Sequence, residues 1–200
     1  MSLVSLIRAG AAIGTIAEYL DGLSYPQQLY EVHTLERREQ ARLYVLAEKA
    51  PPLTFEHFVP AGIPPVTPVI HQGINTLPFP GFKRFQKHFS RPDDGTSRLF
   101  GFNEGLSRPF IGPGYFVVHA TAGNPTWQTR GALVVDYFQV PDRPVPPGWP
   151  RVLPNVVGLQ VLVYFHTRDF MRRVSSRVSI GAAYKSERPI GAYFTLLREP

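Results

Sequence analysis

The first hydrophobic stretch of the chain, Leu3 to Leu20, has its apolar residues at helical spacing. Leu3, Ile7, Ile13, Ala17 and Leu20 recur at intervals that place them along one helix, so the pattern predicts a packed helix. An arginine interrupts the stretch, which leaves it short of the roughly 20 apolar residues of a membrane span. It also lacks the basic flank and the small-residue cleavage site of a signal segment.

A second helix is predicted from Gln27 to Ala50, with apolar residues at similar spacing and a charged middle. Pro51 and Pro52 end it, because proline has no amide proton and clashes with the preceding turn. Residues 1–52 are therefore expected to form an N-terminal helical segment that packs on the remainder of the chain.

From residue 53 onward the pattern changes to short apolar or aromatic runs separated by proline and glycine, which is typical of antiparallel strands. Eight such runs need a closed or nearly closed arrangement to protect their edges. The prediction is an α+β fold, mainly antiparallel β, with a roughly eight-stranded barrel over residues 53–200 in a single domain overall. The candidate strands are Thr54–Val59, Val69–His71, Phe82–Phe89, Ser97–Asn103, Tyr115–Thr121, Arg130–Val140, Arg177–Tyr184 and Ile190–Arg198.

One helix is expected inside the barrel domain, before its last two strands. A proline-rich loop runs from Pro141 to Pro154, and Asn155 follows it as a candidate N-cap. The apolar residues beyond Asn155 recur at helical spacing as far as about residue 175. The pattern therefore predicts a helix over about 156–175.

The second half of the chain resembles small bacterial proteins of the lipocalin-like (calycin) barrel type. The resemblance covers about residues 80–200, and it is a rhythm of a strand, a glycine, a turn and an aromatic strand. It implies an eight-stranded barrel with a cavity for a small, largely apolar molecule. The segments that carry it are Asp136-Tyr137, Asp169–Val174, Val178–Tyr184 and Gly191–Leu197.

Composition excludes several kinds of chemistry. The 200 residues contain no cysteine, which excludes disulfides, thiol nucleophiles and Cys-ligated metals. The six histidines show no metal-binding spacing, and neither a Gly-x-Ser-x-Gly motif nor a phosphate-binding loop occurs. No metal and no cofactor are therefore expected. The net charge of +6 comes mainly from arginine. The sequence contains no RNA-recognition consensus, so no nucleic-acid partner is expected.

Candidate acid–base residues lie within the apolar strands. His119 and Asp136 each interrupt a run of valines, and a side chain of either type inside a barrel would be desolvated and shifted in pKa. With Tyr137 or Tyr193 as a proton donor, they would serve a cofactor-independent isomerase, cyclase or lyase. The alternative interpretation is that both side chains face solvent or make one structural hydrogen bond.

Aromatic residues of the strands are candidates for the lining of a ligand cavity. Arg168 and Arg172 are four residues apart, so on a helix they would share a face and could bind a carboxylate or phosphate. The leading functional hypothesis is therefore binding of a small apolar or amphipathic molecule. The candidate lining residues are Phe85, Phe100, Phe102, Tyr115, Tyr137, Tyr193 and Phe194.

A third hypothesis is a protein-interaction module. The N-terminal helices or the proline-rich loop would dock a partner if the stripe of Leu3, Ile7 and Ile13 were exposed. Without a signal segment or cysteine, a cytoplasmic location is expected. The oligomeric state, the ligand and the choice between enzyme and binding protein stay open at this point.

Overall fold

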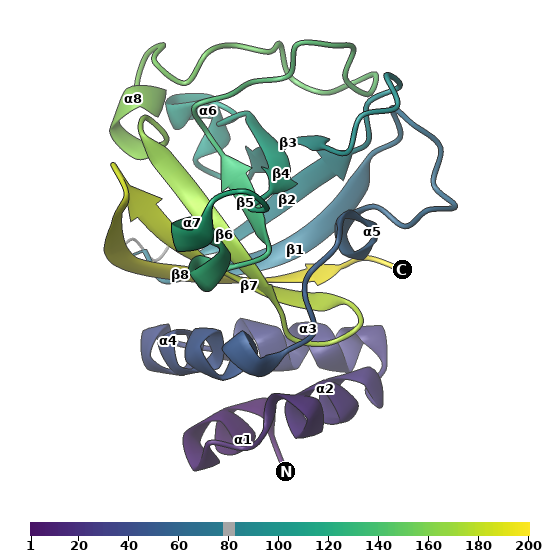
Figure 1. The fold of residues 1–200 in the computed structure, drawn as a ribbon, viewed down its shortest axis with the longest axis vertical. Coiled ribbons are helices and arrows are strands. Elements are labelled where there is room, and N and C mark those ends of the chain that lie inside the picture. Colours follow the sequence, from purple (N-terminus) through teal and green to yellow (C-terminus); the bar gives the residue numbers. More distant parts are fainter. Residues whose placement is uncertain (78–82) are drawn as a thin grey trace.

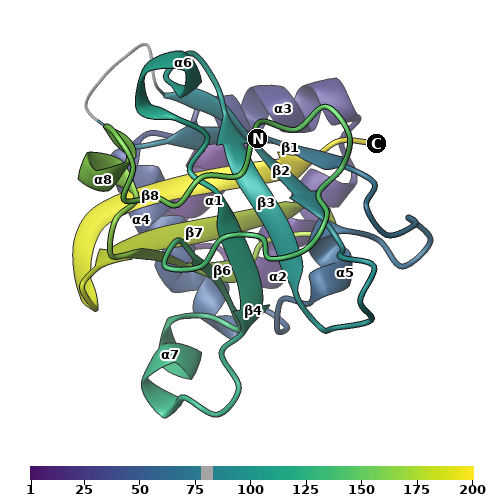
Figure 2. The ribbon, with the colours of Figure 1, turned by 90° about the horizontal axis from the view of Figure 1, so that it is seen from above.

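The computed structural model describes residues 1–77 and 83–200. Its strands pair antiparallel in chain order, and the last strand pairs with the first, so the sheet closes into a barrel (Figures 1 and 2). This confirms the predicted α+β fold with an eight-stranded antiparallel barrel. The strands are β1 (Val69–Asn75), β2 (Arg84–Ser90), β3 (Leu99–Glu104), β4 (Phe116–Ala120), β5 (Leu133–Asp136), β6 (Thr167–Arg173), β7 (Val178–Lys185) and β8 (Arg188–Arg198).

Four α-helices form the N-terminal layer, where two long helices were predicted. The first predicted helix breaks at Gly10, whose φ of +72° ends a helix at little cost only for glycine. The second breaks at 34–36, because Leu35 turns into the core and its carbonyl accepts a hydrogen bond from the Gln40 side chain. The helices are α1 (Leu3–Ala9), α2 (Ile13–Asp21), α3 (Tyr25–His33) and α4 (Arg37–Leu46), followed by the short 3₁₀ helix η1 (Ala47–Lys49).

The helical layer covers the outer face of β7, β8 and β1, below the barrel in Figure 1. Leu3 and Ile7 of α1 are fully buried, and Ile13 of α2 is nearly so, all within this layer. Their burial within the same chain means that the stripe is not available to a partner. The hypothesis that it docks another protein was therefore wrong.

The predicted strand Thr54–Val59 is also wrong, because this segment forms the short helix α5 (Phe55–Phe58). Its Phe58 closes one end of the lumen: the ring stacks on Phe89, with centroids 4.6 Å apart, and the carbonyl lies 3.0 Å from Nε2 of His71. The aromatic residues of this segment thus pack against the barrel as a plug. The adjoining prediction of a strand at Phe82–Phe89 is met from residue 84 on, while Phe82 lies outside the described residues.

The predicted helix over 156–175 is largely wrong. Only α8 (Gln160–Val163) is helical, and residues 167–173 form β6. Asn155 caps no helix; its buried Nδ2 donates to the carbonyls of Tyr115 and Tyr137. The adjacent Phe170 and Met171 are both fully buried, so they cover opposite faces of a strand, and β5 and β7 each require a neighbouring strand to close the barrel. Two further short helices, α6 (Arg108–Ile111) and α7 (Pro125–Arg130), lie in loops at opposite ends of the barrel.

Three glycines allow phenylalanine rings to cross the lumen. Each is paired across neighbouring strands with a phenylalanine, and a Cβ on the glycine would overlap that ring. The missing side chain of each glycine is therefore replaced by a ring from the next strand. This places three aromatic rings inside the barrel at fixed positions. The pairs are Gly73–Phe85, Gly101–Phe116 and Gly181–Phe194.

Gly101→Ala should destabilise the protein by about 1–3 kcal/mol, as overpacked cores do. The new Cβ would collide with the His88 carbonyl and the Phe116 ring, and neither has room to move. Gly14→Ala is the matched control: it lies inside α2 with nothing within 4 Å of a Cβ, and it should stabilise by about 0.5–1 kcal/mol. Urea denaturation measures both. Equal stabilities of the two variants would show that the lumen is looser than described.

Candidate functional site

The middle of the lumen holds a buried charged group. Lys87 of β2 is only 2% exposed, and its ammonium meets Tyr137, which directly follows β5, and Asp169 of β6 from across the barrel. Side chains of opposite strands meet only inside a barrel, so this contact identifies the inward face of each strand. Lys87, Tyr137 and Asp169 point inward, and residues of the opposite alternation point outward.

Lys87 donates to three oxygen atoms. Its Nζ lies 2.5 Å from Oη of Tyr137, 2.9 Å from Oδ1 of Asn103 and 3.5 Å from Oδ2 of Asp169. The Tyr137 hydroxyl in turn donates to Oδ2 of Asp169 at 3.2 Å. Hydrogen bonds thereby connect all four polar groups into one network, in which Lys87 and Asp169 are only 2% and 4% exposed.

Aromatic rings surround the same ammonium. The centroids of the Phe116, Phe194 and Tyr137 rings lie 4.7, 4.9 and 5.0 Å from Nζ, and that of Phe85 lies 5.9 Å away. Ring faces attract a cation, by up to about 2 kcal/mol each where water is excluded. We call these four rings the aromatic cage. They offset part of the cost of burying the lysine. Three of them are the rings that the glycine pairs admit into the lumen.

Burial dominates the titration of this cluster. It lowers the pKa of Lys87 to about 8, against the opposing attraction of Asp169. Burial also raises the pKa of Asp169, although Lys87 and the Tyr137 hydroxyl both stabilise the carboxylate. The pKa of Tyr137 is raised for the same reason, and the neighbouring carboxylate of Asp169 raises it further.

Lys87, Asn103 and Asp169 were not among the predicted site residues. The basic residues of the β2 segment were instead expected on the outer surface of the barrel. The signal was the alternation itself. Phe85, Lys87 and Phe89 occupy every second position, so two core phenylalanines place the lysine between them on the inward face. Of the predicted lining, Phe85, Tyr137 and Phe194 do face the lumen.

His119 and Asp136 come together, but on the outer face of β4 and β5. The His119 Nε2 lies 3.4 Å from Oδ2 of Asp136, and Nε of Arg168 lies 3.1 Å from the same oxygen. Burial opposes ionisation of Asp136, but the hydrogen bonds from His119 and the Phe138 amide, with the charge of Arg168, hold its pKa below the usual range. Neither side chain faces the lumen, so they do not form an acid–base pair there.

The remaining predicted lining residues also point outward. Phe102 and Tyr115 pack with Trp149 of the proline-rich loop, with the Phe102 and Trp149 rings 5.0 Å apart. Phe100 faces outward beside the Arg98 guanidinium. Tyr193 contacts Tyr44 of α4, with ring centroids 5.8 Å apart. The proline-rich loop and the helical layer cover these outward-facing residues, which are therefore apolar. For this reason the sequence pattern did not distinguish them from residues that line the lumen.

Arg168 and Arg172 share a face, as predicted, but on the strand β6 rather than on a helix. Arg168 is bound by Asp136 and by Glu187, whose Oε1 lies 2.6 Å away. Arg172 donates to the backbone carbonyls of Tyr44, Thr129 and Arg130. Both guanidinium groups are thus occupied by partners within the protein.

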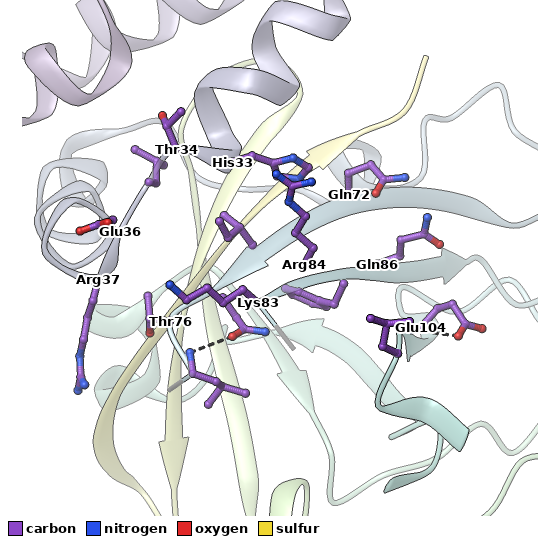
Figure 3. A pocket seen from close by; sticks show the side chains of 17 residues that line it. His33, Thr34, Glu36, Arg37, Gln72, Thr76, Lys83, Arg84, Gln86 and Glu104 are labelled. Carbon is purple, nitrogen blue, oxygen red and sulfur yellow. Dashed lines mark hydrogen bonds between the residues drawn. The ribbon is translucent and has the colours of Figure 1, made fainter. Parts of the chain in front are cut away.

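An open groove of about 1280 Å³ lies between the α3–α4 corner and the end of the β1–β2 pair (Figure 3). Its apolar lining includes Ile74, Leu77 and Phe85, and the last of these also belongs to the aromatic cage. Arg84 reaches from β2 toward His33 at the end of α3 (Figure 3). Burial, with the nearby charge of Arg84, lowers the pKa of His33, so the imidazole adds no positive charge at neutral pH.

Three cations stand at the edge of this groove. Arg37, Lys83 and Arg84 line it, and the side chains of all three make neither an ion pair nor a hydrogen bond within residues 1–77 and 83–200. Of the two acidic residues in the lining, Glu104 is held by Arg108 at 2.7 Å, and Glu36 directly precedes Arg37, so the three cations outnumber the carboxylates. The groove therefore combines apolar surface with unpaired positive charge.

A second hollow, of about 500 Å³, lies near the other end of the barrel, between η1 and the α7 loop. Its lining is mostly of small residues, and its two cations, Arg172 and Arg173 of β6, both donate to backbone carbonyls. Neither hollow is lined by Lys87, Tyr137 or Asp169. We therefore interpret the Lys87 cluster as part of the lumen packing.

Comparison with protein-family models, with curated proteins and with solved structures gives no match. The resemblance to lipocalin-like barrels therefore stays a prediction from the sequence. Among the described residues, no helix has the length and apolar character needed to cross a membrane.

The free energy of unfolding of wild type, relative to Lys87→Met, should rise by about 2 kcal/mol between pH 8 and pH 10. The folded lysine, with a pKa of about 8, loses its proton in this window while the unfolded lysine keeps it. The unfolded state then binds more protons, so stability increases with pH. Urea denaturation across this pH range measures the difference. A constant difference would mean that Lys87 titrates normally.

Proposed function

We propose that the protein binds a small amphipathic molecule with an anionic headgroup in the groove between the α3–α4 corner and the β1–β2 pair. The observation that carries the proposal is the combination of three unpaired cations with an apolar lining in one hollow. Anionic groups form strong charge-assisted hydrogen bonds with Arg and Lys. The tail of the molecule would lie along Ile74, Leu77 and Phe85.

The size of the groove supports a ligand larger than a single ion. Ligand sites commonly occupy about 300–1,000 Å³, and this groove of about 1280 Å³ exceeds that range and is open to solvent. The Lys87 cluster fills the middle of the lumen, so the proposed site is at the barrel end and outer wall rather than at its centre. Phe85 is the residue that separates the two spaces.

Binding is favoured over catalysis because of where the titratable groups lie. His119 and Asp136 are on a different face of the barrel, and Lys87 and Tyr137 do not line the groove. Of the groove's own residues, the imidazole of His33 is neutral near pH 7, and the guanidinium groups are permanent cations. The lining thus offers recognition of charge and apolar surface, without a proton donor matched to an acceptor.

A fluorescent anionic amphiphile, 11-(dansylamino)undecanoic acid, should bind the protein with a fluorescence increase. The double variant Lys83→Gln and Arg84→Gln should weaken binding about tenfold or more, since each loses a charge-assisted contact worth about 1.5–3 kcal/mol. Fluorescence titration at fixed ionic strength measures the dissociation constants.

Lys49→Gln is the matched control, because this exposed lysine lies on η1, outside the groove. It should leave the affinity unchanged. The corresponding neutral alcohol should bind wild type and the double variant alike. If the acid binds the double variant as tightly as wild type, or if no saturable binding occurs, the proposed function is wrong.

A further inference from the structure

Large hydrophobic side chains are exposed together at one end of the barrel. Leu106 and Phe110 are each 75% exposed, and Leu162 is 69% exposed. Isolated exposed hydrophobic residues are ordinary, but a contiguous group of them marks an interaction surface. The seven residues, named the apolar rim here, are Leu106, Phe110, Val156, Val157, Leu159, Leu162 and Val163.

The fold holds the two segments of the apolar rim next to each other. The backbone amide of Gly114, just after α6, donates to Oε1 of Gln160 in α8 at 2.9 Å. A Cβ at Gly112 would overlap the same glutamine side chain, so the two helices touch at this point. Figure 1 shows α6 and α8 at the top of the barrel, opposite the helical layer of α1–α4.

The exposure of these side chains does not contribute to folding. In α8 the buried residue is Gln160, whereas Leu162 and Val163 point away from the protein. In α6 no residue is buried. Two helices of four residues each thus present apolar side chains outward and anchor themselves mainly through polar groups, which is the reverse of the usual arrangement.

Cations flank the rim, and the acidic residue next to it, Glu104, is paired with Arg108 at 2.7 Å. The sequence has no Asp or Glu from Gly105 to Val135 or from Arg143 to Arg168. Glu187, in the neighbouring β7–β8 turn, is neutralised by Arg130 and Arg168 at 2.6 Å each. The turn also carries the exposed Arg188, and Lys185 donates to the carbonyl of Leu162 at 3.0 Å.

We propose that the apolar rim docks on a lipid bilayer that carries anionic headgroups. Phe110 and Leu162 would enter the boundary between headgroups and acyl chains, and the cations of the β7–β8 turn would face the lipid phosphates. Interfacial protein segments combine apolar side chains with flanking Lys and Arg in this way. The proposal uses a surface other than the cationic edge of the groove, so it stands or falls separately from ligand binding.

The test is flotation of the full chain with vesicles of phosphatidylcholine, with or without one fifth phosphatidylglycerol. Wild type should float with the anionic vesicles at low salt, and at least tenfold less with pure phosphatidylcholine or in 0.5 M salt, where charges are screened. The double variant Phe110→Ser and Leu162→Ser should lose at least tenfold in partitioning to the anionic vesicles.

Tyr30→Ser with Val45→Ser is the matched control, because these exposed residues lie on α3 and α4, away from the rim. This variant should float like wild type, and a wild-type circular dichroism spectrum with cooperative urea unfolding would show that both double variants are folded. The proposal is overturned if wild type floats with neither vesicle, if it floats equally with both, or if the two double variants behave alike. Self-association that the rim substitutions abolish, without any vesicle binding, would also overturn it and assign the rim to a second copy.

Discussion

A lysine ammonium buried in the barrel is the constraint that organises the lumen. Removing such a charge from water costs several kcal/mol, and the attraction of Asp169 at 3.5 Å recovers only part of it. The aromatic cage and the hydrogen bonds from Lys87 to Tyr137 and Asn103 recover a further part, and the lowered pKa of Lys87 reflects the cost that remains. The cage in turn requires the glycines opposite its phenylalanines. Charge, rings and glycines therefore depend on one another, and the lumen is filled at its centre as a result.

The sequence pattern was sufficient for the fold class, because period-two runs separated by proline and glycine specify antiparallel strands. The pattern failed for two segments whose residues are locally compatible with either a helix or a strand. The residues 167–173 satisfy helical spacing, yet they form β6 because Arg168 and Arg172 point outward while Asp169 and Met171 point inward. The segment 54–59 has strand-like composition, but its phenylalanines are used to plug the barrel end. In both cases tertiary contacts decide between two locally acceptable structures.

The candidate site was less accessible to sequence reasoning than the fold. The groove is built from the α3–α4 corner, the facing ends of β1 and β2, and the loop after β3, which are far apart along the chain. Alternation shows which residues share a side with Phe85, Tyr137 or Phe194 in each of their segments. It does not say which side of each segment faces the lumen. The proline-rich loop gives Phe102 and Tyr115 an apolar covering outside the barrel, so both faces of these strands are hydrophobic.

The helical layer spans the line along which the barrel closes. Its apolar residues pack on β7 and β8 and also on Ile74 of β1, so the layer contacts both sides of the β1–β8 pairing. These helices come first in the chain, yet the surface that covers them is complete only when the final strands have formed. During synthesis their apolar side would thus stay uncovered until β7 and β8 have been translated, which makes these helices the part most in need of protection from aggregation.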